Sequence, residues 1–178
     1  PELLITNAGT TVVNRRQWER KRRLEVLDLF AAHMFGRVPN HVDNELRFEV
    51  LERGLTLQGS ARRLQVRLFF APGRNAPALD LLIYAPVGAN RRNPCPMFLG
   101  LNFMGNHTVT TDPMVDVTKS WVRNRTEIGY QNNQASAAAR GVSAERWPIQ
   151  LLIESGFGIA TAYYGDIDPD FDDGFMNG

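Results

Sequence analysis

The segment that most constrains the fold is Pro94–His107, which has the sequence PCPMFLGLNFMGNH. Within it, Met97–Leu101 is a short and almost wholly apolar run that two prolines introduce. A run that is apolar on both faces is typical of a central strand in a sheet covered by helices on both sides. Asn102–His107 follows as a polar loop that contains glycine. Because loops at the carboxyl ends of such strands carry ligands and chemistry, this loop is the first candidate for a functional site.

The composition indicates one ordinary globular domain. The chain has 178 residues, of which 43% are hydrophobic and 22% charged, so it can bury a core. The net charge of +1 gives no overall attraction to nucleic acid or to an anionic membrane. Cys95 has no second cysteine to pair with, and no apolar run approaches the roughly 18 residues of a membrane helix. No signal peptide is visible at Pro1, although a mature secreted form would look the same.

Arginines occur in adjacent pairs along the chain. An Arg-rich tract can bind phosphate or carboxylate, but solvated helix faces and turns explain such pairs more simply, and we adopt that interpretation. The pairs are Arg15-Arg16, Arg22-Arg23, Arg62-Arg63 and Arg91-Arg92.

The first half of the chain predicts a helix followed by an antiparallel meander. Residues 1–14 lack periodicity and indicate an arm, after which Asn14 is placed to cap a helix over Arg15–Phe35 that Gly36 and Pro39 end. Three alternating runs separated by turn residues then predict strands with one solvated face. These runs are Leu46–Leu51, Leu64–Phe70 and Leu79–Tyr84.

The second half predicts a strand–helix–strand unit. Residues 108–140 form a polar stretch longer than ordinary loops, so we expect it to be functional or to hold short helices. Ser143–Ser155 indicates a helix that Gly156 ends, and Phe157–Tyr164 a second buried strand. A meander that leads into two parallel strands joined through a helix is the opening half of an α/β-hydrolase sheet. We therefore expect a single domain over residues 1–178 that is the incomplete N-terminal part of such a fold.

Ser143 and the three histidines are weak candidates for catalysis. Gly141–Glu145 has four-fifths of a Gly-x-Ser-x-Gly elbow, but no strand precedes it, so helix capping explains Ser143 better. His33 lies on the predicted helix as a packing or surface residue, and His41 lies in a turn. His107 lies beyond the buried strand, where it either lines a site or makes a local hydrogen bond.

The acidic segment Gly165–Gly174, GDIDPDFDDG, has the alternating carboxylates of a calcium loop. It lacks the flanking helices and the bidentate glutamate of an EF-hand, because Asn177 occupies the twelfth position counted from Asp166. We therefore predict no metal site and no cofactor, and expect Asp166 to Asp173 to cap turns and bind neighbouring arginines. Asn106 and Asn124 both fit the N-glycosylation pattern, which matches often by chance.

Three segments resemble the glucuronoyl methylesterases, carbohydrate esterase family fifteen, especially their bacterial branch. These segments are FLGLNFMGNHTV at Phe98–Val109, RGVSAERWPIQLLIESGFGIATAYYGDIDPDFDDG at Arg140–Gly174, and the end of the first helix, Phe35–Pro39. The resemblance implies an α/β-hydrolase fold and a secreted or periplasmic serine esterase. The substrate it implies is the ester between lignin alcohols and the 4-O-methylglucuronic acid of xylan.

The catalytic residues that the resemblance implies are not in the chain. The family nucleophile lies in a Gly-x-Ser-Arg-x-Gly-Lys motif with a histidine and an acid further on, and none of these is present. We therefore name no catalytic residue and expect the remaining C-terminal part of the hydrolase domain as a partner. The residues expected to line the substrate cleft are Asn102, Gly105, Asn106, His107 and Asp166. Gly105 and its neighbours occupy the loop that in this fold supplies a hydrogen-bond donor to the oxyanion. In the family that the chain resembles, an arginine beside the nucleophile also helps to stabilise the oxyanion.

Two alternative functions stay open from the sequence. The chain could be a carbohydrate-binding module without catalysis, in which Trp121, Trp147, Tyr163 and Tyr164 stack on sugars, although most of these follow apolar periodicity. It could also belong to another α/β-hydrolase, such as an acetyl xylan esterase. A nucleophile motif downstream of Gly178 in the gene distinguishes an esterase from a binding module. We further expect the loops after the two buried strands to meet at one sheet edge, and the strand Met97–Leu101 to lack its outer neighbour.

Overall fold

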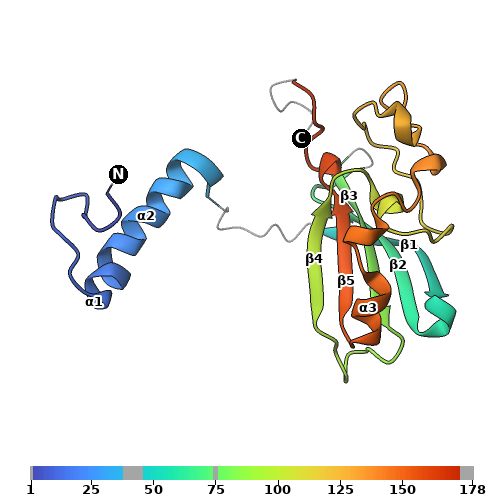
Figure 1. Cartoon of the computed structure of the whole chain (residues 1–178), viewed down its shortest axis with the longest axis horizontal. Helices are drawn as coiled ribbons and strands as arrows, with labels where there is room; N and C mark the ends of the chain where they lie inside the picture. Colours follow the sequence, from blue (N-terminus) through green and yellow to red (C-terminus); the bar gives the residue numbers. More distant parts are fainter. Residues whose placement is uncertain (1, 38–45, 74–75, 173–178) are drawn as a thin grey trace. The chain divides into compact units, whose positions relative to one another are not determined.

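The computed structural model describes residues 2–37, 46–73 and 76–172 and divides the chain into two compact units, Pro1–Val42 and Asp43–Gly178 (Figure 1). In the first unit the backbone is helical from Arg15 to Phe35. It comprises α1 (Arg15–Gln17), a π-helical turn, α2 (Arg23–Phe30) and a second π-helical turn. Asn14 Oδ1 accepts a hydrogen bond from Gln17 N at 2.9 Å, which confirms the predicted cap. Gly36 ends the helix with φ of +72°.

Residues before the helix form a hairpin, whereas the lack of periodicity in the sequence predicted only an arm. Ile5 and Thr11 form a bridge, and the hairpin packs on the helix through Arg22, which is 3% exposed. The Arg22 guanidinium donates to the carbonyl oxygens of Glu2 and Leu3 at 2.7 and 3.0 Å and pairs with Glu25 at 3.1 Å. The prediction that Arg22 lies on a solvated face is therefore wrong, because the hairpin buries the guanidinium and supplies the acceptors that it needs.

The second unit contains a five-stranded mixed sheet in the order β1-β2-β3-β5-β4 (Figure 1). Neighbouring strands from β1 to β5 are antiparallel, and β4 and β5 are parallel, with Asn102 opposite Tyr163. The strands are β1 (Arg47–Thr56), β2 (Ala61–Phe69), β3 (Ala78–Pro86), β4 (Met97–Asn102) and β5 (Gly158–Tyr163). This arrangement confirms the antiparallel meander leading into parallel strands, which is the N-terminal portion of an α/β-hydrolase sheet.

The helix between β4 and β5 is shorter than predicted. A 3₁₀ turn covers Ala144–Arg146, and α3 covers only Ile149–Glu154, lying over β3 and β5 (Figure 1). Pro148 separates this turn from α3. Because proline has no backbone N–H and its ring clashes with the preceding turn, one continuous helix cannot run through it. Ser143 makes no side-chain capping bond, so the prediction that it caps this helix is wrong. Gly156 ends the helix with φ of +83°, as expected.

The long stretch 108–140 belongs to the core and contains short 3₁₀ turns, as expected. Val109 and Val115 pack with Leu82, Tyr84 and the buried side of α3. A second cluster joins residues of the same stretch to the end of β5. Its buried members are Val122, Tyr130, Ala139 and Tyr163. The core therefore depends on this stretch as much as on the strands.

In the described structure β4 pairs only with β5 and so forms an edge of the sheet. Leu99 is 76% exposed and Phe98 54% exposed, which is unusual for a strand this apolar. The run that the sequence placed at the centre of a complete sheet thus has an open side in this chain. None of the described helices is both long and apolar enough to cross a bilayer.

Candidate functional site

The loops that follow β4 and β5 meet at the carboxyl edge of these two strands, as predicted. Both loops contact Asp80 at the start of β3. Asn106, from the loop after β4, donates its Nδ2 to the Asp80 carbonyl oxygen at 2.7 Å. Asp166, from the loop after β5, accepts the Asp80 backbone N–H on Oδ2 at 3.1 Å. One residue of β3 therefore fixes both candidate loops.

Asn102 holds the loop after β4 in its turned conformation. It is 2% exposed, and its Oδ1 accepts the backbone N–H of Gly105 at 2.8 Å. Its Nδ2 donates to Asn106 Oδ1 at 2.7 Å and to Thr161 Oγ1 at 3.1 Å. Gly105 has φ of +96°, and a Cβ there would lie 2.6 Å from Thr118 Cγ2. Because the Gly105 N–H is already bonded, any donor from this loop to a substrate must be another amide.

His107 lies beneath the same loop with no exposed surface. Its Nε2 lies 3.0 Å from the Tyr130 hydroxyl, which donates to the Met104 carbonyl oxygen at 2.6 Å. The hydroxyl has one hydrogen, so Nε2 must carry the proton in this contact. Burial, with a smaller contribution from the Arg140 charge, lowers the pKa of His107 to about 4. His107 is therefore a neutral side chain that supports the loop from within.

Asp166 is the partly buried carboxylate of the candidate site. Its Oδ1 accepts the Ser120 hydroxyl at 2.6 Å, and burial raises its pKa despite that bond and the one from the Asp80 amide. Asp166 and Asn106 both line a cavity of about 30 Å³, which is large enough to hold a water molecule. Of the residues predicted to line a cleft, these two share a cavity, while Asn102, Gly105 and His107 lie buried behind them.

The acidic segment after β5 does not gather its carboxylates around one point. Asp170 pairs with Arg123 at 2.9 Å, which confirms the predicted arginine contact. Asp168 Oδ1 is buried without a partner in the described structure, and Asp173 lies outside the described residues. In the ranges 2–37, 46–73 and 76–172, no group of three or more His, Cys, Asp or Glu side chains could hold a metal ion.

Ser143 does not lie on a strand-to-helix elbow, and its backbone N–H donates to the Thr108 carbonyl oxygen at 2.9 Å. His33 is exposed on the first helix, and His41 lies outside the described residues. Asn106 uses both polar ends of its side chain, which leaves none for a glycan. At the second such motif, Asn124 Oδ1 accepts the Asn133 N–H at 2.7 Å.

The aromatic residues considered for sugar stacking are mostly packed. Tyr163 is 2% exposed and donates its hydroxyl to the Trp121 carbonyl oxygen at 3.0 Å. Trp147 packs against the main core cluster, and a Cβ at Gly100 of β4 would lie 3.4 Å from its ring atom Cη2. A sugar platform needs an open ring face, so these two residues do not favour a binding module.

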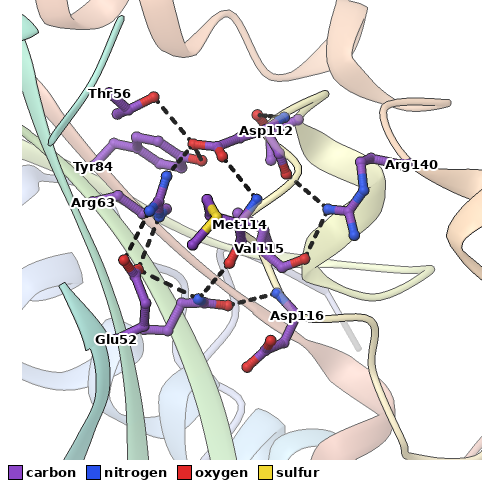
Figure 2. A network of polar contacts seen from close by, with 11 residues as sticks. Glu52, Thr56, Arg63, Tyr84, Asp112, Met114, Val115, Asp116 and Arg140 are labelled. Atoms are coloured by element: carbon purple, nitrogen blue, oxygen red, sulfur yellow. Dashed lines mark hydrogen bonds and ion pairs between the residues drawn. The ribbon is translucent and has the colours of Figure 1, made fainter. Parts of the chain in front are cut away.

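Sequence reasoning missed a buried polar network centred on Arg63 of β2, shown in Figure 2. Arg63, whose side chain is 4% exposed, donates through Nε and Nη2 to both carboxylate oxygens of Glu52 at 2.9 and 2.8 Å. Its Nη1 donates to Asp112, which also accepts the Thr56 hydroxyl at 3.0 Å. Gly54 leaves the space for the guanidinium, since a Cβ there would lie 2.5 Å from Arg63 Nη2. The prediction that Arg63 is a solvated turn charge is wrong.

The network fixes the start of the long stretch on the meander. Gln65 donates to the Met114 carbonyl oxygen at 3.0 Å and accepts the Asp116 N–H at 2.8 Å. From the other side Arg140 donates to the carbonyl oxygens of Asp112 and Val115, both at 2.7 Å (Figure 2). These bonds hold the long stretch in place. The stretch covers His107 and contains Ser120, whose hydroxyl donates to Asp166.

The charges of the network stabilise one another. The hydrogen bond from Arg63 lowers the pKa of Glu52, and the same pair raises the pKa of Arg63. Burial alone would raise the pKa of Asp112, but hydrogen bonds from the Met114 N–H and Arg63 outweigh it and lower the pKa. Both carboxylates are therefore ionised at neutral pH.

Comparisons with known proteins identify similar esterases. No family model matches the chain. The chain is 47% identical over 171 residues to a carbohydrate esterase called MZ0003 from an unknown prokaryotic organism, covering 96% of this chain and 39% of that protein. Among solved structures, a promiscuous CE15 esterase from a marine bacterial metagenome matches with a TM-score of 0.81 at 45% identity, over 97% of this chain and 42% of the other. A glucuronoyl esterase from Solibacter usitatus matches with a TM-score of 0.82 at 35% identity, and the match covers 100% of this chain and 44% of the other. They confirm the resemblance, and the chain spans about two-fifths of the length of these relatives.

Proposed function

We propose, from the similarity of nearly the whole chain to esterases of carbohydrate esterase family fifteen, that it forms the N-terminal part of a serine esterase. Its substrate is the ester between a lignin alcohol and the 4-O-methylglucuronate of xylan. The observation that carries this proposal is the open side of β4 next to a carboxyl edge where two loops converge. A strand from the rest of the hydrolase domain would pair with β4 and bring the nucleophile to that edge.

Ester cleavage needs a nucleophile, a base and donors for the developing oxyanion. The described residues provide neither a nucleophile nor a base in a competent arrangement, since Ser143 lies on no strand-to-helix elbow and His107 is buried against Tyr130. The chain contributes instead a preorganised wall, in which Asn102 fixes the loop after β4 and Asp80 joins that loop to Asp166. Such an enzyme would be secreted or periplasmic, so that it could reach its polymeric substrate.

The test compares the 178-residue chain with the product of the full gene. We expect the gene product to contain a Gly-x-Ser-Arg-x-Gly-Lys motif, to hydrolyse the benzyl ester of glucuronic acid, and to lose this activity when the motif serine is changed to alanine. The 178-residue chain alone should release no alcohol.

Three results would contradict the proposal. Hydrolysis by the 178-residue chain that Ser143→Ala abolishes would place the nucleophile in this chain. Hydrolysis of acetylated xylan without action on uronate esters would indicate an acetyl xylan esterase. Oligosaccharide binding without hydrolysis of any ester would indicate a binding module.

A further inference from the structure

An open pocket of about 350 Å³ lies in the first unit between the N-terminal hairpin and the beginning of the helix. This volume falls within the roughly 300–1,000 Å³ of small-molecule sites and suits one sugar residue with its substituents. Its walls come from two elements that are distant from the sheet in sequence. The lining residues are Thr6, Thr10, Thr11, Val12, Arg16, Gln17, Arg20 and Lys21.

Three of the residues that line the pocket carry a positive charge, and none of the lining residues is acidic. Arg16, Arg20 and Lys21 make no ion pair within the described part of the chain. Their helix neighbours differ, because Arg15 pairs with Glu19 at 2.7 Å and Arg22 with Glu25. Three cations that face one concave surface without a carboxylate produce a local positive potential that attracts anions.

The walls of the pocket are held in place without any ligand. Thr10 N donates to Thr6 Oγ1 at 3.1 Å inside the hairpin, and Val13 N donates to Gln17 Oε1 at 2.9 Å between hairpin and helix. Asn7 N donates to Glu25 Oε2 at 2.9 Å, and the buried Arg22 fixes the base of the hairpin. A pocket that is formed in advance loses little conformational entropy when it binds.

We propose that this pocket binds the carboxylate of a glucuronate side group of acidic xylan and so retains the polysaccharide on the enzyme. The identification of the polysaccharide rests on the proposed function. A guanidinium fork matches a carboxylate with two parallel hydrogen bonds, and a lysine and threonine hydroxyls add further donors. A neutral sugar has no charge to meet these three cations, so the pocket selects the acidic substituent.

The test measures binding of oligosaccharides by calorimetry to the full gene product, with its motif serine changed to alanine so that no ester is cleaved. The probes are a xylo-oligosaccharide that carries one 4-O-methylglucuronate and a neutral xylo-oligosaccharide of the same length. We expect only the acidic probe to bind, with an affinity that falls as salt is added. The double variant Arg16→Gln/Arg20→Gln should weaken binding about tenfold, because both guanidinium groups that would pair with the carboxylate are lost.

Arg15→Gln is the matched control, since Arg15 lies on the same turn but pairs with Glu19 and does not line the pocket. Far-UV circular dichroism checks that each variant keeps its helix. Equal binding of the neutral probe, no binding of the acidic probe, or equal weakening by Arg15→Gln would overturn the proposal. Competition by inorganic sulfate at the same concentration as the acidic probe would show a general anion site instead.

The two proposals fail separately. In the full gene product the double variant should leave hydrolysis of the small benzyl ester unchanged while it slows release from polymeric glucuronoxylan. A gene product that binds acidic xylan through this pocket but hydrolyses no ester would contradict the esterase proposal and leave the pocket in place.

Discussion

Replacing Arg63 with methionine tests whether the buried network holds the long stretch on the meander. Methionine keeps most of the side-chain length but removes every hydrogen bond to Glu52 and Asp112. The two carboxylates then remain next to each other without a cation, with side chains only 21% and 11% exposed. Breaking a buried ion pair by removing one partner costs about 3–5 kcal/mol. Because Glu52 is partly accessible to water, we expect the lower part of that range.

Arg67→Met is the matched control on the same strand. Arg67 pairs with both carboxylate oxygens of Asp80 at 2.6 and 2.7 Å, but these side chains are 39% and 42% exposed. An exposed pair of this kind contributes about 0–1 kcal/mol. The assay is urea unfolding of the full gene product, followed by tryptophan fluorescence. Limited proteolysis should in addition cut the Arg63 variant near Met114, where the anchor is lost.

The pH dependence gives a second readout of the same network. Glu52 and Asp112 have native pKa values below their ordinary values. Their contribution to stability is therefore complete above the ordinary values and is lost as pH falls through the native ones. The Arg63 variant should show a weaker loss on acidification. Equal destabilisation by the Arg63 and Arg67 variants would refute the reasoning, since the Arg63 group is more buried and pairs with two carboxylates, whereas the more exposed Arg67 pairs with one.

Two further predictions concern the sheet edge and the buried histidine. Leu99→Lys should reduce light scattering by the 178-residue chain, where Leu99 is 76% exposed, but should destabilise the full gene product by about 1–2 kcal/mol because the rest of the hydrolase domain would cover this side chain there. Leu151→Lys on α3, 61% exposed, should change neither, and equal effects of the two would contradict an additional strand. His107 has its pKa lowered from 6.5 to about 4, so the unfolded chain takes up the proton first and stability should fall by about 3 kcal/mol between these pH values. Urea midpoints from pH 7 to 4.5 should show a smaller slope for His107→Gln than for the wild type. Equal slopes for the two proteins would refute the assignment.

The sequence by itself determined the first helix, the five strands and the order of these elements. The alternation of apolar and polar residues predicted the meander. The run Met97–Leu101, apolar on both faces, predicted a strand that should be buried in a complete sheet, and Asn14 and Gly36 marked the two ends of the first helix. These signals are local, because side-chain period, capping and turn chemistry act over a few residues. The same local rules placed the candidate loops after β4 and β5 at one edge, since parallel neighbours end together.

Only the tertiary structure decided how individual polar side chains are used. Arg63 and Asp112 are 49 positions apart, and Asn106 bonds a carbonyl 26 positions away, so no pattern of neighbouring residues announces either contact. A paired arginine such as Arg22 or Arg63 has the same local sequence signature whether it is solvated or buried. What distinguishes them is whether the fold brings carbonyls or carboxylates to the guanidinium, because a buried charge persists only where the rest of the chain satisfies it.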